Sequence, residues 1–398
     1  AAVGASYTLM VFLNSIQLGL CMGSGAAFSI YYGAQDFTRL HRSRFVAFVL
    51  IGLLTLVLNI AVFLWLDPLM GLMHVPADIY TLMREYLWAV CWGIGFTFLY
   101  NYYASLLRAV GDSLTPLLFL AISVVLNIGL DLLFILPLDW GVAGAAWATV
   151  IAQAVSAFSL MIYTYGRVPE LRIRRSDMHF SRDIAGEIAS FSLLTCVQQS
   201  VMNLGILMVQ GLVNSFGTVV MAAFTVAVKI DTLAYMPAQD FGNAFSTFIA
   251  QNYGAGDRER VHESIHKGLL IHLTTSALFS VIIFSGRYPM MHLFVGDDPT
   301  VIAIGAQVTA LIAPCYVLFT LVEVLSATMR GVGDAVVPAA ITMVFTCIVR
   351  LIYLWGYAFS HNSNLTIAVI YPISWVLTSI AFLLYYKSRK WMPKGFHF

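Results

Sequence analysis

Two polar side chains stand four residues apart inside a long apolar segment of the first half of the chain. Asn127 and Asp131 lie within 114–136, and this spacing puts both on one face of a helix. Thr149 lies in the next apolar segment, 142–166. Because the connection between the segments is short, the two helices are expected to be antiparallel neighbours. A carboxylate, an amide oxygen and a hydroxyl can then converge.

These oxygen atoms suit a small hard cation such as Na⁺, and a buried carboxylate can instead take up a proton. Charged side chains are expensive within a membrane, so each is a functional candidate. Two interpretations of Asp131 and its neighbours remain open at this point. They form a cation-binding site, or they are a polar cluster that only ties helices together.

The second half of the chain carries its own charges inside apolar segments. Lys229 and Arg350 are both far from a segment end, so each is expected to have an anion within reach. Asp231 and Glu323 are the candidates. The four residues form either a structural charge network or a second coupling site.

The composition indicates a membrane protein. Hydrophobic residues make up 60% of the 398 residues, charged residues 10%, and mean hydropathy is +0.84, whereas soluble domains are about 25% charged. The net charge of +1 gives no indication of nucleic-acid binding. The five cysteines lack zinc-ligand spacing and are interpreted as free packing thiols. Eleven segments are long enough to span a bilayer, near 1–29, 44–66, 84–107, 114–136, 142–166, 184–214, 217–250, 263–286, 301–328, 335–360 and 365–387.

The chain contains an internal duplication. RAVGDSLTP at 108–116 recurs as RGVGDAVVP at 330–338, an offset of 222 residues (330 minus 108). YGAQDFTRLH at 32–41 recurs as YGAGDRERVH at 253–262, an offset of 221 (253 minus 32). In a membrane protein, internal repeats are typical of secondary transporters. The repeated proline and Gly-Asp are interpreted as a helix start after a tight turn, across which the arginine and aspartate can pair.

The duplication predicts an all-α membrane protein with two lobes. We expect an N-terminal lobe at 1–166, a cytoplasmic linker at 167–183, a C-terminal lobe at 184–388 and a cytoplasmic tail at 389–398. Alternate connections on one side hold 17 of the 21 Lys and Arg residues, and the opposite side holds only Arg84 and Arg287. This asymmetry places the C-terminus in the cytoplasm and residue 1 outside.

The offset also predicts a missing helix. Residue 1 corresponds to residue 222, so the segment 184–214 has no counterpart in the first half. We therefore expect eleven transmembrane helices of a twelve-helix parent that lacks its first helix here.

Several phrases resemble the multidrug and toxic compound extrusion (MATE) family, in particular its DinF-like branch. They are FIAQNYGAGDRERV (248–261), MPAQDFGNAFS (236–246), LRAVGDSLTP (107–116), LNIGLDLLFI (126–135) and GVAGAAWAT (141–149). The resemblance covers nearly the whole chain in the family's order. It implies a twelve-helix exporter of amphipathic organic cations, driven by inward flow of protons or sodium ions.

The resemblance also implies a set of cation-coupling residues. They map onto Asn127, Asp131, Thr149 and Asn101, with Na⁺ a possible metal at Asp131 and Asn127. A first-helix aspartate that completes this site in the family has no counterpart here. Other branches place acids on the seventh and tenth helices, whereas this seventh helix offers Gln198, Gln199 and Asn203.

The predicted function is a secondary active antiporter that exports organic cations across a prokaryotic cytoplasmic membrane by alternating access. It needs no cofactor beyond the coupling ion, H⁺ or Na⁺, and it is expected to act as a monomer in the lipid bilayer. The alternative within transport is a flippase of lipid-linked precursors from the same superfamily, for which only Lys229 and Arg350 offer basic groups. An intramembrane enzyme is disfavoured because the chain lacks H-E-x-x-H and Gly-x-Ser-x-Gly motifs.

Overall fold

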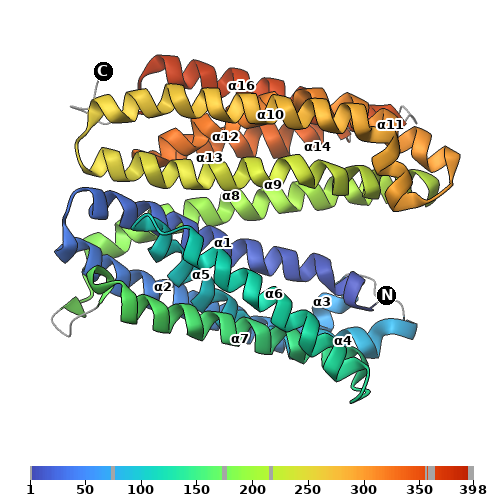
Figure 1. The fold of residues 1–398 in the computed structure, drawn as a ribbon, viewed down its shortest axis with the longest axis horizontal. Coiled ribbons are helices and arrows are strands. Elements are labelled where there is room, and N and C mark those ends of the chain that lie inside the picture. The colour runs from blue at the N-terminus through green and yellow to red at the C-terminus, as the bar shows by residue number, and fades with distance from the viewer. Residues whose placement is uncertain are drawn as a thin grey trace. The chain divides into compact units, whose positions relative to one another are not determined.

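The computed structural model describes residues 2–72, 77–172, 177–214, 218–354, 356 and 364–392. All regular elements in these ranges are helical, which confirms the all-α class (Figure 1). The chain divides into two compact units, Ala1–Ser200 and Val201–Phe398. The division falls within one helix, α8 (Arg182–Asn214).

In the described part of the first unit, seven α-helices and one 3₁₀ turn precede α8. α6 packs against α7, and α1 and α7 both pack against α5. The elements are α1 (Ala2–Gly33), α2 (Phe37–Leu64), α3 (Leu66–Leu72), α4 (Ala77–Cys91), α5 (Ile94–Ala109), α6 (Leu114–Ile135), α7 (Gly141–Arg167) and the 3₁₀ turn η1 (Pro169–Leu171).

In the second unit the long helix α9 packs against α10, α11 and α12. The core between these helices is apolar and aromatic, with Phe224, Tyr316, Phe319 and Trp375 among its buried side chains. The elements are α9 (Thr218–Gly254), α10 (Arg258–Val295), α11 (Pro299–Ile312), η3 (Ala313–Cys315), α12 (Tyr316–Gly331), α13 (Val336–Thr342), the π-helical η4 (Met343–Ile348), α14 (Val349–Tyr353), α15 (Asn364–Ala368) and α16 (Ile370–Ser388).

Nine of the described helical segments are long and apolar enough to cross a membrane. They correspond to nine of the eleven predicted segments. The other two predicted segments, 84–107 and 184–214, are not among the nine, and the first of them is divided between α4 and α5. The count of eleven therefore stays a prediction.

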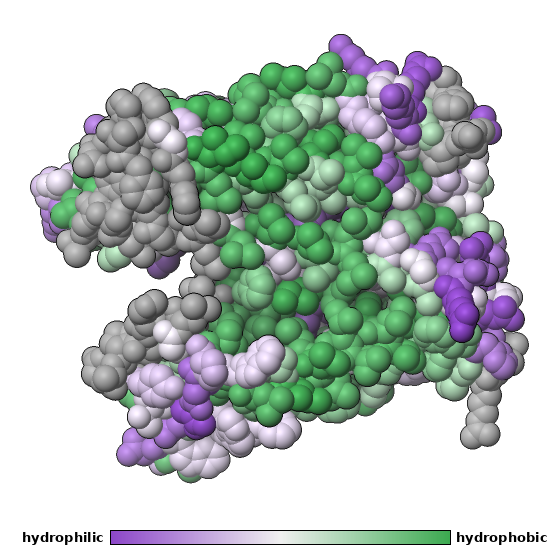
Figure 2. Space-filling view, turned by 180° about the vertical axis from the view of Figure 1, so that it is seen from behind, coloured by the Kyte–Doolittle hydropathy of each residue, from purple (hydrophilic) through white to green (hydrophobic). Residues whose placement is uncertain are grey.

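The surface of these helices matches the membrane prediction. Figure 2 shows hydrophobic residues along the lengths of the helices and hydrophilic residues gathered towards their ends. On α6, apolar side chains are exposed on most turns, because only one face of this helix packs on protein; they include Leu117, Leu120, Val124, Ile128 and Leu132.

Both copies of the repeated Arg-x-Val-Gly-Asp phrase form the same turn. Gly111 and Gly333 have φ angles of 95° and 96°, a left-handed conformation that glycine adopts without steric cost. Asp112 Oδ1 accepts a hydrogen bond from the Thr115 N–H at 3.0 Å, and Asp334 plays the same part in the second copy. The predicted Arg–Asp pairing is corrected, since within the described chain these aspartates cap helices and form no ion pair with arginine.

The second repeated phrase also forms equivalent turns. Asp36 and Asp257 cap α2 and α10 by accepting from the N–H three residues later, at 2.9 and 3.0 Å. The residue before each aspartate is left-handed, with φ of 58° at Gln35 and 74° at Gly256. A glycine is therefore not required in the first copy.

A helix interruption is repeated as well. The turn at Trp92 and Gly93 separates α4 from α5, and η3 separates α11 from α12. Adding the 222-residue offset to Trp92 gives Pro314, the central residue of η3. The duplication thus extends from the connections into the helix interiors.

Candidate functional site

Three side-chain hydrogen bonds, one on each successive turn, tie α6 to α7. Their positions on α6 are four residues apart, so they follow one face of the helix. They run from Ser156 Oγ to Phe119 O (3.3 Å), from Ser123 Oγ to Ala152 O (3.0 Å) and from Asn127 Nδ2 to Thr149 Oγ1 (3.4 Å).

Asp131 occupies the next turn of the same face. The antiparallel register puts it near the level of Ala145, whose carbonyl accepts the Thr149 hydroxyl at 3.0 Å. Asp131 is half-buried, and its Oδ1 atom is buried without a hydrogen-bond partner in the described chain. The predicted approach of Asn127 and Thr149 is therefore observed, and Asp131 extends that row.

The electrostatic surroundings of Asp131 contain no paired base. No ion pair joins it to Lys, Arg or His in the described ranges. Tyr86 on α4 is close enough to interact electrostatically with the carboxylate. Asn101, half-buried on α5, makes no hydrogen bond to Asn127, Asp131 or Thr149 in the part of the chain that the structure describes, so the structure does not bring it into direct contact with them.

The second unit holds a buried group around Arg350. Arg350 is 5% exposed, its Nε donates to Ser374 Oγ at 3.0 Å, and its guanidinium lies 4.6 Å from the centre of the Tyr371 ring. Asp231 on α9 interacts electrostatically with Arg350 and with the hydroxyl of Tyr316. The predicted neighbourhood of Asp231 and Arg350 is observed, although no ion pair within 4.0 Å is formed.

The other two predicted members of this network lie elsewhere. Glu323 on α12 sits against α9, where its Oε2 atom would be 3.0 Å from a Cβ added to Gly242. Its electrostatic partner is Arg330, one of the repeated arginines. Lys229 is exposed on α9 and has no ion pair among the described residues. The expectation that Asp231 or Glu323 neutralises Lys229 is therefore corrected, because Lys229 faces outward on its helix.

Sequence reasoning missed several residues of these groups. Ser123 was detectable, since it precedes Asn127 by four residues. Tyr316, Tyr371 and Ser374 carry no sequence signal for Arg350, because they come from distant elements and have ordinary roles in apolar helices.

The described residues contain no group of three or more His, Cys, Asp or Glu side chains that could hold a metal ion. The cysteines are free thiols, as expected. Around Asp131 the oxygen atoms on the same row belong to one carboxylate, an amide, a hydroxyl and a backbone carbonyl.

Apolar helices of spanning length and a duplicated set of turns define a membrane transporter of the internally repeated kind, and its half-buried carboxylate forms no ion pair within the described ranges. The MatE family model matches residues 1–133 and 193–355. The chain belongs to this family, the multidrug and toxic compound extrusion transporters, and not to a family of enzymes.

Similar proteins cover almost the whole chain. A "Probable multidrug resistance protein YoeA" of Bacillus subtilis is 25% identical over 97% of this chain and 85% of its own. A second Bacillus subtilis protein, "Probable multidrug resistance protein YpnP", is 27% identical over 98% and 87%. A protein named "FAD transporter" of Shewanella oneidensis is 21% identical over 76% and 68%.

Solved structures show the same fold. A crystal structure of MATE in complex with MaL6 superimposes with a TM-score of 0.91 at 20% identity, covering 98% of this chain and 87% of that one. An outward-facing MATE transporter of the MOP superfamily gives a TM-score of 0.90 at 21% identity, with the same coverage.

Proposed function

We propose that the chain is a secondary active antiporter that exports amphipathic organic cations across the cytoplasmic membrane, driven by inward movement of protons or sodium ions. The observation that carries the proposal is Asp131. Its carboxylate has a buried oxygen without a hydrogen-bond partner and no paired base within the described chain. A carboxylate in this setting is satisfied by a proton or by a small cation, and both are coupling chemistries.

Asn127 and Thr149 support this assignment. The Asn127 amide donates to Thr149, so its carbonyl oxygen is left to accept, and the Thr149 hydroxyl already donates to Ala145 O. Both residues therefore offer oxygen lone pairs on the row that leads to Asp131. Such atoms can ligate Na⁺ or accept a hydrogen bond from a protonated carboxyl group. Asn101 belongs to the proposal by resemblance alone.

The transport cycle proposed is alternating access. Binding of the coupling ion at Asp131 drives the cycle only through unequal affinity for the inward-open and outward-open states. The division of the chain into two compact units supports this mechanism, since duplicated transporters commonly work by movement of one repeat against the other.

The cargo is proposed from the relatives. YoeA and YpnP are named as probable multidrug resistance proteins, and this favours organic cations. The relative named "FAD transporter" suggests an anionic cargo as the alternative. A flippase of lipid-linked precursors would also carry an anionic cargo. Anionic cargo needs free basic groups, but Arg350 is already engaged by Ser374 and Tyr371, and Lys229 is exposed on α9.

The test is efflux from proteoliposomes under imposed proton and sodium gradients. Asp131→Asn keeps the shape of the side chain and removes its charge, so we expect cargo binding and folding to persist while gradient-driven efflux is lost. Asp139→Asn is the matched control, because Asp139 is exposed just beyond α6 at a φ of 52°, a conformation that Asn tolerates. Parental gradient-driven efflux by Asp131→Asn would reject this site.

A further inference from the structure

Two side-chain amides from other helices hold the joint between α4 and α5, residues 91–94. Gln17 of α1 donates from Nε2 to the Ile94 backbone oxygen at 2.9 Å. Asn59 of α2 donates from Nδ2 to the Cys91 backbone oxygen, also at 2.9 Å. These amides satisfy backbone carbonyls at a point where the helix is interrupted, and buried carbonyls need such donors.

A third amide reaches the same joint from α7. A Cβ added to Gly93 would lie 2.2 Å from Gln153 Oε1, so the Gln153 amide occupies the place of a side chain at Gly93. The Gly93 backbone oxygen accepts from the Thr97 N–H at 2.9 Å and from Thr97 Oγ1 at 3.1 Å. The backbone carbonyls of Cys91, Gly93 and Ile94 therefore all have donors already.

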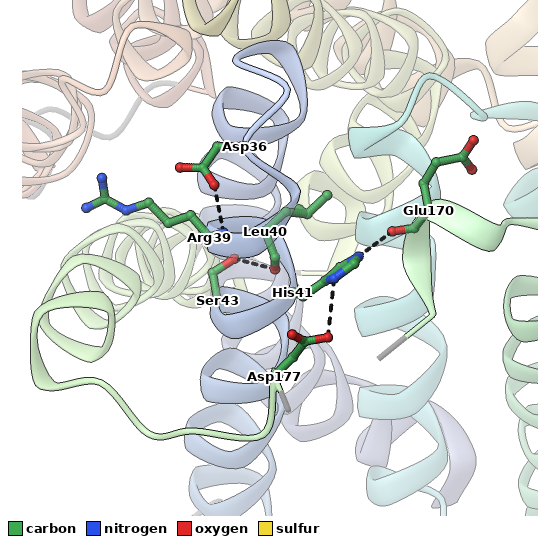
Figure 3. A network of polar contacts seen from close by, with 7 residues as sticks. All are labelled: Asp36, Arg39, Leu40, His41, Ser43, Glu170 and Asp177. Atoms are coloured by element: carbon green, nitrogen blue, oxygen red, sulfur yellow. Dashed lines mark hydrogen bonds and ion pairs between the residues drawn. The ribbon is translucent and has the colours of Figure 1, made fainter. Parts of the chain in front are cut away.

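Two amide oxygen atoms at the joint have no donor. Gln17 is 1% exposed, and Gln17 Oε1 and Gln153 Oε1 are both buried without a hydrogen-bond partner in the described chain. Figure 3 shows the usual arrangement in the same unit, where Ser43 Oγ donates to the Leu40 backbone oxygen at 2.8 Å. Because a buried acceptor without a donor is costly, each of the two amide oxygens needs a donor from a ligand.

The start of α5 supplies hydrogen-bond donors at the same joint. No side chain of the described residues caps this helix at Gly93, and the first N–H groups of a helix lack an acceptor within it. A ligand that donates to amide oxygens and accepts from N–H groups has the chemistry of water. A metal cation fits less well, because the carbonyls are engaged and the beginning of a helix is positively polarised.

The equivalent joint in the second unit is apolar. The 222-residue offset pairs Ile94 with Tyr316 (94 plus 222) and Gln153 with Trp375 (153 plus 222). The Tyr316 N–H donates to the Ala313 backbone oxygen within η3, and the ring centres of Tyr316 and Trp375 are 6.3 Å apart. An aromatic side chain thus takes the place of Gln153, so the duplicated interruption does not by itself require amides.

We propose that the α4–α5 joint is a water-binding site. Water bound there donates hydrogen bonds to Gln17 Oε1 and Gln153 Oε1 and accepts from the first N–H groups of α5. The first unit therefore has a hydrated joint, whereas the joint at η3 in the second unit is dry. The site goes beyond the proposed antiport and does not use Asp131.

Water-edited solid-state NMR of the whole protein in lipid bilayers tests the site. The reporter is the backbone N–H of Ile94, a residue that is 3% exposed and so is shielded from bulk water. Ala313, which is fully buried in η3, reports on the second joint. We expect magnetisation to pass from water to Ile94 early and to Ala313 late. Transfer to Ile94 no faster than to Ala313 overturns the proposal.

A glutamine variant makes the test specific. Gln153→Met keeps the length of the side chain and removes the amide oxygen, so we expect about fivefold weaker transfer at Ile94, the worth of one hydrogen bond. Gln239→Met is the matched control, because the Gln239 amide donates directly to Tyr235 Oη at 3.4 Å in the second unit. Transfer at Ile94 should stay parental in the control. Undiminished transfer in Gln153→Met, or an equal loss in Gln239→Met, would contradict the site.

A cation at the joint would give a different result. In the Asp131→Asn variant, which removes the other candidate cation site, replacing Na⁺ by choline should leave transfer at Ile94 unchanged. A change on replacement would mean that Na⁺ occupies the joint and would overturn the assignment to water. Failure of Asp131→Asn to uncouple efflux would leave these measurements unaffected, so the two proposals are tested separately.

Discussion

Two aspartates within apolar helices have a buried oxygen without a hydrogen-bond partner in the described chain, and their surroundings separate their roles. Asp131 has no cation paired with it, and Tyr86 is its polar neighbour from α4. Asp231 has Arg350 and the Tyr316 hydroxyl nearby. A resident counter-charge favours a fixed, structural carboxylate, whereas its absence favours one that binds and releases an ion.

The Arg350 group predicts a stability effect. Arg350→Met removes the hydrogen bond to Ser374 and the cation that interacts electrostatically with the Asp231 carboxylate, so we expect the free energy of unfolding to fall by about 3 kcal/mol. Thermal unfolding in detergent measures this change. Lys229→Met is the control from the same unit, and because Lys229 is exposed without an ion pair in the described chain, the change should have little effect.

The double variant Asp231→Asn with Arg350→Met should recover part of the lost stability, because the carboxylate charge is then removed too. A double variant no more stable than Arg350→Met would mean that packing on Tyr371, not charge, explains the loss.

Asp67, which lies between α2 and α4, predicts a pH dependence of stability. Hydrogen bonds from Arg84 Nε at 2.7 Å and Tyr80 Oη at 3.0 Å hold the pKa of Asp67 below 3.8, the value of an unperturbed aspartate. Because the pKa of Asp67 is lower in the folded state, this contact stabilises the fold at pH values above the pKa that Asp67 has in the unfolded state. The stabilisation is lost as pH falls through the pKa of the folded state. The contribution is small, because the pair is exposed.

Carboxyl chemical shifts of Asp67 followed during acid titration should therefore give a midpoint below 3.8. Arg84→Leu should move that midpoint upwards. An unchanged midpoint in Arg84→Leu would show that Arg84 does not perturb Asp67 in solution.

Spacing within a helix predicted contacts between residues better than did position within a segment. The four-residue spacing and the short connection were enough to bring Asn127 to Thr149. Lys229 was expected to be paired because it lies inside an apolar segment, but depth along a helix does not say which face a residue occupies. Arg330 was assigned to a turn, but it lies on α12 seven residues after Glu323, so both residues share one face of that helix and interact electrostatically.

At the scale of elements, the close contact of α1 with the first half of α8 depends on two glycines. A Cβ added to Gly19 would lie 2.5 Å from the Cys196 Cα, and one added to Gly23 would lie 2.3 Å from the Phe191 backbone oxygen. Glycines four residues apart allow two helix backbones to approach closely in a membrane. This Gly-x-x-x-Gly spacing was visible in the sequence, but the helix that it contacts was not.

This contact predicts that Gly23→Ala destabilises the protein by about 1–3 kcal/mol, since backbone atoms must move to admit the methyl group. Gly129→Ala is the matched control in the interior of α6, where an added Cβ has no atom within 4 Å. The control should be neutral or slightly stabilising, because alanine is the better helix former. Equal unfolding temperatures for the two variants would contradict the close contact.

For the molecule as a whole, composition and the repeated phrases were sufficient to predict an all-helical, duplicated membrane protein. The boundary between the two units lies at a different place from the predicted linker. The predicted division at the polar linker 167–183 follows charge, whereas the compact units meet within α8, between Ser200 and Val201. In the first unit, contact with α1 explains why the beginning of α8 belongs to it, because Gly19 and Gly23 let α8 pack closely on α1.

The asymmetry of basic residues predicts the orientation of the protein in the membrane. A cysteine introduced at the exposed Met178, in the linker, should react with a membrane-impermeant maleimide only after the cells are permeabilised. A cysteine at the exposed Leu138, between α6 and α7, should react in intact cells. The unsubstituted protein gives the background from its own thiols. The reverse pattern of labelling would show that the protein has the opposite orientation in the membrane.

The repeated turns have a consequence for how the two halves diverged after gene duplication. Gly111 and Gly333 keep the same backbone angle, and the α4–α5 interruption recurs at η3. Charged residues recur in the turns but not inside the apolar segments, since the 222-residue offset pairs Asp131 with Tyr353 and Arg350 with Ile128. After the duplication both halves thus kept the same turns, while the charged residues inside their apolar segments diverged.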